Sequence, residues 1–205
     1  MSNEVFEMIC AMDRRGIELQ LILQCAPTLA RLKTSNLFIL PREDEDKARF
    51  VLRHLGLLGY RLVYDRHRVV FLVFNRDMLT DYLSQPQVQS FLAGYGYRAD
   101  SFGYILRTFQ SRYADYISDR TSFPHEMGAL LGYPLEDVTG FIDNDGQDFL
   151  YSGYWKVYDG VEEKKALFAS FDQVKDQMIM DLSAGCSISD ILDRYKNMSS
   201  IKKAV

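Results

Sequence analysis

The chain has 205 residues, of which 47% are hydrophobic, 13% aromatic and 25% charged, and its formal net charge is −4. This composition is typical of a globular protein and excludes disordered and low-complexity chains. The excess of acidic residues argues against a general nucleic-acid binder, which needs Lys and Arg to neutralise phosphates. The longest uninterrupted apolar run, Val69–Phe74, is far shorter than the roughly 20 residues of a membrane span. We therefore expect neither a nucleic acid nor a membrane as a partner.

The amino-terminal residues do not resemble an export signal. A signal peptide starts with basic residues and continues with an apolar stretch, whereas Glu4 and Glu7 come first here and charged residues follow at 13–15. We therefore expect a cytoplasmic protein whose cysteines are reduced thiols. Their odd number and wide spacing predict neither a disulfide nor a cysteine-rich metal site. They are Cys10, Cys25 and Cys186.

The first predicted element is a helix over residues 17–33. Apolar residues recur there every three or four positions, which is the spacing of a helix with one face in the core. Pro27 disturbs this pattern, because it has no N–H group and its ring clashes with the carbonyl of Leu23. We expect the helix to end or bend near Ala26 and a second helical piece to begin at Pro27.

A strand and a second helix are expected next. Residues 36–40 form a short apolar run that stops at Pro41, which predicts a strand. The acidic residues 43–46 suit the first turn of a helix. This helix is expected to reach about Leu58 and to end at Gly59.

A β-hairpin is predicted over residues 60–65 and 68–74, which flank a short turn. The second of these segments is apolar on both faces, and this places it in the centre of the sheet. The next elements are helices over residues 77–95 and 99–117, which are broken at Pro86 and at Gly94 and Gly96. Two short helices joined by a turn at 132–134 follow, and then a strand over residues 154–158. A helix over residues 161–183 and a terminal helix capped by Ser187 or Ser189 complete the prediction.

These elements predict a single α+β domain over residues 1–205. Its sheet is expected to be small, mainly antiparallel or mixed, with about four strands and numerous helices packed around it. No linker rich in Gly, Ser or Pro divides the chain.

Cys25 is of chemical interest because of the nearby proline. If a helix began at Pro27, Cys25 would lie just ahead of its N-terminus, where free N–H groups lower the pKa of a thiol. Thr28 would stand one turn further on, with a hydroxyl able to contact a bound group. The alternative is an inert core residue, because Cys25 shares an apolar stripe with Leu21 and Leu32.

The last predicted strand carries a lysine among aromatic residues. Side chains alternate along a strand, so Trp155 and Val157 should be buried in the core. The side chains that face the other way are those of Tyr154, Lys156 and Tyr158. Lys156 would then lie between two tyrosines, where an aromatic face could hold its ammonium for an anionic ligand. The alternative is a lysine that discourages edge-to-edge pairing of strands.

The three histidines are isolated from one another in the sequence. His125 and Glu126 follow Pro124 in the first turn of a predicted helix, where free N–H groups could orient an anion or a polar substrate. The alternative is that Glu126 complements the helix dipole. No metal-ligand spacing, phosphate-binding glycine motif or nucleophile elbow occurs, so we predict no metal site and leave any cofactor unknown.

Charge is distributed unevenly along the chain. Residues 42–76 contain eight Lys or Arg and five Asp or Glu, a balance of +3, whereas residues 134–163 contain eight acidic residues and Lys156 alone, a balance of −7. Solvated faces explain this pattern. The alternative is an acidic surface for a basic partner, or self-association between the two regions.

Five short segments have a familiar order and spacing: residues 25–30 (CAPTLA), 33–38 (KTSNLF), 123–128 (FPHEMG), 131–142 (LGYPLEDVTGFI) and 152–158 (SGYWKVY). Together they resemble an uncharacterised bacterial family, domain of unknown function 3793, over residues from about 21 to 168. The resemblance implies a stand-alone cytosolic protein of no established activity, encoded near flavodoxins and ferrous-iron transport, and hence a role in iron or redox homeostasis. Relatives often have cysteines before the Trp-Lys-Val-Tyr element. In this chain those places hold Phe149, Tyr151, Ser152 and Tyr154.

We expect a non-catalytic accessory protein that binds a small molecule or a redox partner. The first alternative is an enzyme whose site joins Cys25, the connection from Lys33 to Asn36, and Lys156. The second is a structural interaction protein or homo-oligomer, for which the 13 Phe and 13 Tyr residues would supply contacts. The residues expected to bind a ligand are Cys25, Thr28, Lys33, Asn36, His125, Glu126, Tyr154, Lys156 and Tyr158.

Overall fold

The computed structural model describes residues 3–98, 101–120 and 122–203. The elements before residue 100 are α1 (Asn3–Ala11), α2 (Ile17–Leu29), β1 (Ser35–Pro41), η1 (Arg42–Asp44), α3 (Glu45–His54), β2 (Leu58–Tyr64), β3 (Arg68–Phe74), α4 (Arg76–Leu83) and α5 (Pro86–Ala93). Those after it are α6 (Phe102–Ile117), α7 (Met127–Leu130), α8 (Leu135–Asp143), β4 (Tyr151–Ser152), β5 (Lys156–Val157), α9 (Val161–Ser183) and α10 (Ile188–Lys203).

The main sheet is antiparallel, with strand order β1-β3-β2. The prediction that β3 is central is confirmed. Alternate residues of β3 enter two different cores, Val69, Phe71 and Val73 on one face and Val70, Leu72 and Phe74 on the other. This division follows from the two-residue period of a strand. With the separate β4–β5 hairpin, the fold is the α+β fold predicted.

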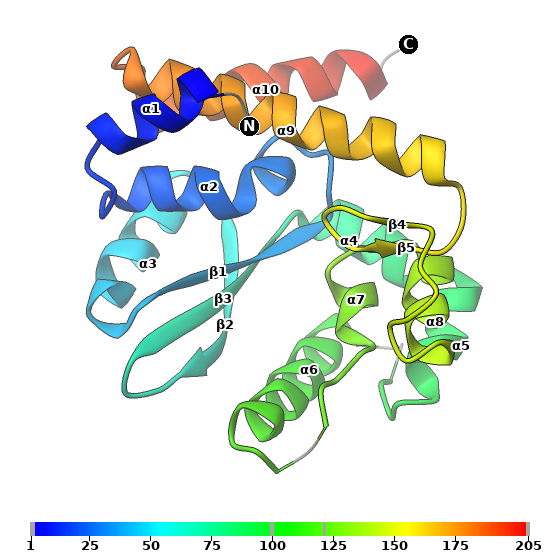
Figure 1. Cartoon of the computed structure of the whole chain (residues 1–205). Helices are drawn as coiled ribbons and strands as arrows, with labels where there is room; N and C mark the ends of the chain where they lie inside the picture. Colours follow the sequence, from blue (N-terminus) through cyan, green and yellow to red (C-terminus); the bar gives the residue numbers. More distant parts are fainter. Residues whose placement is uncertain (1–2, 99–100, 121, 204–205) are drawn as a thin grey trace.

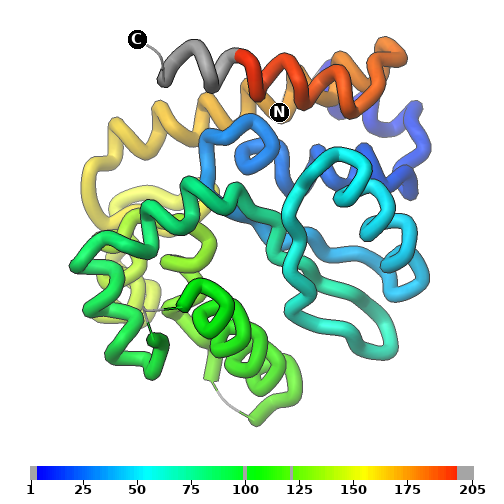
Figure 2. Tube along the Cα trace, turned by 180° about the vertical axis from the view of Figure 1, so that it is seen from behind, coloured from blue at the N-terminus to red at the C-terminus, as the bar shows by residue number. Residues whose placement is uncertain are grey.

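Helices cover both faces of this sheet (Figure 1). One core contains residues of α1, α2, α3, α9 and α10, and the other contains residues of α4, α5, α6 and α7. Figure 2 shows α2 and α6 on opposite sides of the strands. A third, smaller core joins the β4–β5 hairpin to α9 through Trp155, Val157, Phe168 and Phe171. Helix α9 therefore packs against both the first core and the hairpin.

Glutamine side chains form hydrogen bonds with backbone groups at both edges of the sheet. On β1, the Gln24 amide accepts from Ile39 N at 2.8 Å and donates to Ile39 O at 3.0 Å. On β2, Gln110 donates to the carbonyl of Arg61 at 2.7 Å and accepts from the hydroxyl of Tyr60 at 3.1 Å. Backbone groups that an edge strand would leave for water are thus hydrogen-bonded to α2 and α6.

The predicted break at Pro27 is wrong, because α2 continues through the proline to Leu29. Pro27 lies in the last turn of the helix, so only two helical residues follow the position that lacks an N–H donor, and the proline is buried. Its carbonyl accepts from the amides of Leu32 and Lys33, at 2.9 and 3.2 Å. The proline thus closes the turn that leads from α2 to β1.

Two other predicted boundaries need correction. The helix expected to reach Leu58 ends at His54, because Gly56 turns the chain with a φ of +64° and Gly59 already belongs to β2. The strand expected over residues 154–158 is reduced to β5, which pairs with β4 over two residue pairs. The start predicted at Ala99 lies outside the described residues, and α6 begins at Phe102.

The two C-terminal helices follow the prediction closely. Helix α9 has the predicted bounds, and Gly185 follows it with a φ of +86°. Ser187 is the cap of α10, since its hydroxyl accepts from Asp190 N at 3.2 Å. Within the described ranges, no helix combines the length and the apolar character needed to cross a membrane.

Candidate functional site

A cavity of about 270 Å³ lies between the α7–α8 region and the β4–β5 hairpin. Most of its wall is apolar or aromatic. The lining residues are Phe123, His125, Met127, Gly128, Leu131, Tyr133, Asp137, Val138, Phe141, Tyr154, Trp155 and Lys156. Three of the residues expected to bind a ligand, His125, Tyr154 and Lys156, are therefore brought to one cavity.

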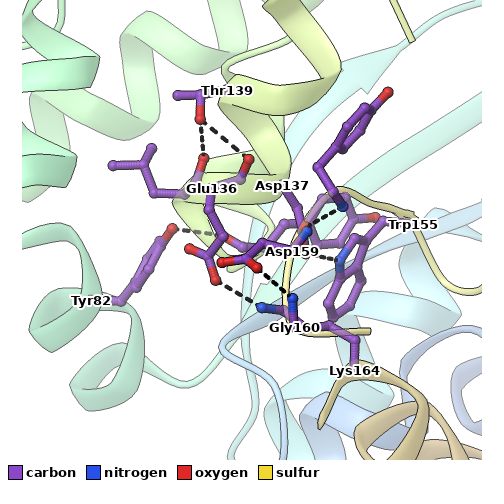
Figure 3. Close-up of polar contacts among 11 residues, drawn as sticks. Tyr82, Glu136, Asp137, Thr139, Trp155, Asp159, Gly160 and Lys164 are labelled. Atoms are coloured by element: carbon purple, nitrogen blue, oxygen red, sulfur yellow. Dashed lines mark hydrogen bonds and ion pairs between the residues drawn. The ribbon is translucent and has the colours of Figure 1, made fainter. Parts of the chain in front are cut away.

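Asp137 holds the hairpin against α8 (Figure 3). It lies in the first turn of α8 and is 2% exposed. One carboxylate oxygen accepts from Nε1 of Trp155 at 2.7 Å, and the other accepts from the amides of Tyr158 and Asp159 at 2.8 and 3.4 Å. Both oxygens are thus engaged by protein donors, which fixes the indole in the cavity wall.

Tyr133 and Trp155 form the stacked part of this wall. Their ring centroids are 4.8 Å apart with an interplanar angle of 25°, and Phe168 meets the Trp155 ring edge-on at 4.5 Å. Burial raises the pKa of the Tyr133 phenol. The Tyr133 carbonyl accepts from the hydroxyl of Tyr82 at 2.6 Å, so α4 also positions this residue.

The ion pair of Glu136 with Lys164 fastens the start of α8 to α9 (Figure 3). The two side chains meet at 2.8 Å. Because the Lys164 ammonium bonds to the Glu136 carboxylate, it lowers the pKa of that carboxyl despite the opposing effect of burial. The cavity wall is therefore connected to the longest described helix through a charged contact as well as through aromatic packing.

Lys156 lies in the cavity wall among phenylalanines. Its Nζ donates to the carbonyl of Gly146 at 2.6 Å and lies 4.7 and 5.6 Å from the ring centroids of Phe149 and Phe141. The prediction that Trp155 and Val157 are buried is confirmed. The expected place of Lys156 between two tyrosines is wrong, because the rings that its ammonium faces are those of Phe141 and Phe149, which lie outside the strand.

The two tyrosines beside Lys156 have separate roles. The Tyr154 ring lines the cavity, while its hydroxyl donates to Asp172 at 3.0 Å and accepts from Lys175 at 3.2 Å. The Tyr158 ring lies against the backbone of Gly140, where any β-carbon would come within 2.5 Å of it. The Tyr158 hydroxyl is buried without a hydrogen-bond partner in the described part of the chain.

His125 and Glu126 point in different directions. The His125 ring contacts Phe123 and Phe141, with centroids 5.3 and 5.2 Å apart, and lines the cavity. Glu126 is fully buried and does not line it. One of its oxygens accepts from Arg112 and, at 3.2 Å, from the hydroxyl of Tyr97. Glu126 therefore anchors α7 to α6, and the two residues do not form one binding site.

The Arg112–Glu126 contact gives a stability prediction. The Glu126 side chain is 1% exposed and that of Arg112 is 39% exposed, so Arg112 can rehydrate if its partner is lost. We expect Glu126→Leu to cost about 1 kcal/mol and Arg112→Leu, which leaves the buried carboxylate with the Tyr97 hydroxyl as its one described donor, about 2 kcal/mol. Urea unfolding at pH 7 measures both values. The opposite order would contradict this account.

The residues predicted around Cys25 form a separate group at the end of α2. Thr28 donates to the side chain of Asn36 at 2.7 Å, and the Cys25 thiol lies 3.7 Å from the carbonyl of Leu37. Cys25 is fully buried, and burial raises the pKa of its thiol. This is the opposite of the activated thiol expected of a helix N-terminus at Pro27. Neither Cys25 nor Asn36 lines the cavity that contains Lys156.

Lys33 connects this group to the cavity wall. Its Nζ lies 4.8 Å from the ring centroid of Tyr133, whose ring lines the cavity. The residue is 5% exposed, and desolvation lowers the pKa of its ammonium to about 8. In the described part of the chain, no carboxylate pairs with it.

Tyr133, Asp137 and Phe141 were not predicted as site residues. All three lie in residues 131–142, one of the segments that carry the family resemblance, and this was the available signal. Among the described residues, no group of three or more His, Cys, Asp and Glu side chains is placed to hold a metal ion.

The comparison with protein families matches most of the chain. The model of the family described as "Protein of unknown function (DUF3793)" covers residues 21–192, which include the sheet, the cavity and α9. No curated protein and no solved structure matches the chain. The predicted resemblance is confirmed, and this chain belongs to the DUF3793 family of proteins of unknown function.

Proposed function

We propose that this protein binds a small aromatic molecule in the cavity beside Trp155 and does not transform it chemically. The observation that supports the proposal is the wall itself, in which Tyr133, Phe141, Tyr154 and Trp155 surround one cavity of about 270 Å³. That volume equals about nine water molecules at ~30 Å³ each. It is close to the small end of ligand pockets, which begin at roughly 300 Å³, and suits a single or fused ring.

The polar contacts around the wall favour binding over catalysis. Both carboxylate oxygens of Asp137 already accept hydrogen bonds, one from Trp155 and the other from backbone amides. The buried Cys25 thiol lies outside the lining. A wall held in place before the ligand arrives also lowers the entropic cost of binding. These observations support an accessory protein that stores, carries or senses a compound.

The cellular setting belongs to the proposal as well. We place the protein in the cytoplasm, in agreement with its three free cysteines. A role in iron or redox homeostasis rests on the family resemblance alone. An absorption spectrum and a native mass spectrum of protein purified without oxygen test that role directly, because a bound flavin or haem would be visible in both.

The single tryptophan of the chain is a reporter for this cavity. We expect a panel of one- and two-ring aromatic compounds to contain ligands that change Trp155 fluorescence and raise the melting temperature. Phe141→Ala should weaken their binding about tenfold, because it removes a ring from the wall.

Phe50→Ala is the matched control. Phe50 is an exposed ring on α3 that is stacked on His54 and does not line the cavity. Equal effects of Phe50→Ala and Phe141→Ala, or a panel without any effect on Trp155, would refute binding in this cavity.

A further inference from the structure

Among the described residues, basic side chains outnumber acidic ones in the cavity lining. Lys156 and His125 line it, and Lys33 stands behind Tyr133. The lone acidic side chain of the lining, Asp137, has both oxygens occupied by internal donors. A ligand entering the cavity therefore meets available positive charge and a carboxylate that is already satisfied.

Among the described residues, Lys156 has no carboxylate partner. The described residues give it one hydrogen bond, to the Gly146 carbonyl, and two aromatic faces, those of Phe149 and Phe141. An ammonium group has three N–H donors, so this arrangement leaves donors for a ligand oxygen. The phenylalanine rings also limit the positions that the ammonium can take.

Lys33 adds a second cation without a carboxylate partner in the described ranges. It is buried, and its ammonium lies over Tyr133 rather than against an acid. Burying a charge without a partner is costly. Negative charge on the cavity side of Tyr133 would reduce that cost.

The sequence around the cavity has a net negative charge, which opposes the binding of an anionic ligand. Residues 134–163 have a balance of −7, from eight acidic residues and Lys156. Several of these acids, such as Asp143, Asp145 and Asp148, are exposed. Salt screens exposed charges beyond about 8–10 Å, whereas charges in an apolar cavity are screened much less. Of the charged side chains that line the cavity in the described part of the chain, Lys156 is the one that still has donors for a ligand.

We propose that the ligand is a one- or two-ring aromatic molecule that carries one carboxylate group. This inference rests on the proposed function and names its ligand class. The ring would pack against Trp155 and Phe141, and the anionic group would accept hydrogen bonds from Lys156.

Matched acids and amides test the proposal. Phenylacetate is compared with phenylacetamide, and indole-3-acetate with indole-3-acetamide, by isothermal titration calorimetry at low and physiological salt. We expect each acid to bind at least tenfold more tightly than its amide. This comparison uses the wild-type protein and does not depend on the folding of any variant.

Two lysine variants show which residue causes the preference for acids over amides. Lys156→Met should abolish the difference between acid and amide. Lys165→Met should leave it unchanged, because Lys165 pairs with Glu162 and lies over the Tyr151 ring outside the lining. Loss of the preference in both variants would overturn the role of Lys156.

The possible failures are distinguishable. If the amides bind as tightly as the acids, the anionic class is wrong and binding of aromatic molecules stands. If no acid, no amide and no compound of the panel changes Trp155 fluorescence, the inference and the proposed function both fail.

Discussion

Asp137→Ala is expected to destabilise the protein by about 3–5 kcal/mol, the largest loss among the substitutions considered. The change removes the acceptor of one buried donor, the Trp155 indole, and of two partly buried amides, those of Tyr158 and Asp159. A buried donor left unsatisfied costs roughly 1–3 kcal/mol, and the loss of hydrogen bonds from the two amides to a charged acceptor adds about 1.5–3 kcal/mol. Chemical denaturation measures the free energy of unfolding. The emission of Trp155 should also shift to longer wavelength as the indole gains contact with water.

Asp143→Ala is the control for this experiment. Asp143 is an exposed acid at the end of the same helix, and its removal should change stability by less than about 0.5 kcal/mol. If Asp137→Ala behaves like Asp143→Ala, the carboxylate does not hold the hairpin.

Lys33→Met is expected to stabilise the protein at pH 7, by about 2–3 kcal/mol. In the folded state, burial lowers the pKa of Lys33 from 10.5 to about 8. At pH 7 the ammonium is charged in both states, and the folded state bears the cost of desolvating it. Methionine keeps the apolar stem over Tyr133 and removes the charge.

The stability difference should depend on pH in one direction. Between pH 8 and 10.5 the unfolded chain binds the Lys33 proton and the folded chain has released it, so wild-type stability gains about 1.4 kcal/mol per pH unit from this residue. The difference in the free energy of unfolding between Lys33→Met and wild type is therefore largest below pH 8 and decreases above it. Cys25 titrates in both proteins and largely cancels in the difference. A gap that widens from pH 7 to 10 would contradict the buried ammonium.

Features set by local pattern were predictable from the sequence. The apolar faces of residues 68–74 identified the central strand, and the serine before α10 identified its cap, because both depend on neighbours within a few residues. The burial of Trp155 and Val157 also followed from local alternation. The group of residues that resembles the DUF3793 family was sufficient to identify it.

Features that depend on distant contacts were not predictable. In the sequence, Asp137 looks like an ordinary acidic residue in the first turn of a helix, because its hydrogen-bond donors lie 18 to 22 residues further along the chain. Lys33 meets Tyr133 although 100 positions separate them. At Pro27 the prediction of a break failed, because the proline is buried in the last turn of α2 and the helix continues through it despite its unfavourable helix propensity.

The glutamines at the sheet edges have a consequence for aggregation. An extended chain that added to β1 would need the N–H and carbonyl of Ile39, and Gln24 already uses both. A second molecule would have to break two hydrogen bonds before forming its own, and Gln110 presents a similar obstacle at Arg61 on β2. These hydrogen bonds make the addition of another strand at Ile39 and at Arg61 less favourable, even though Ile39 exposes part of its side chain. The same protection directs partners away from strand addition and toward the helices and the hairpin.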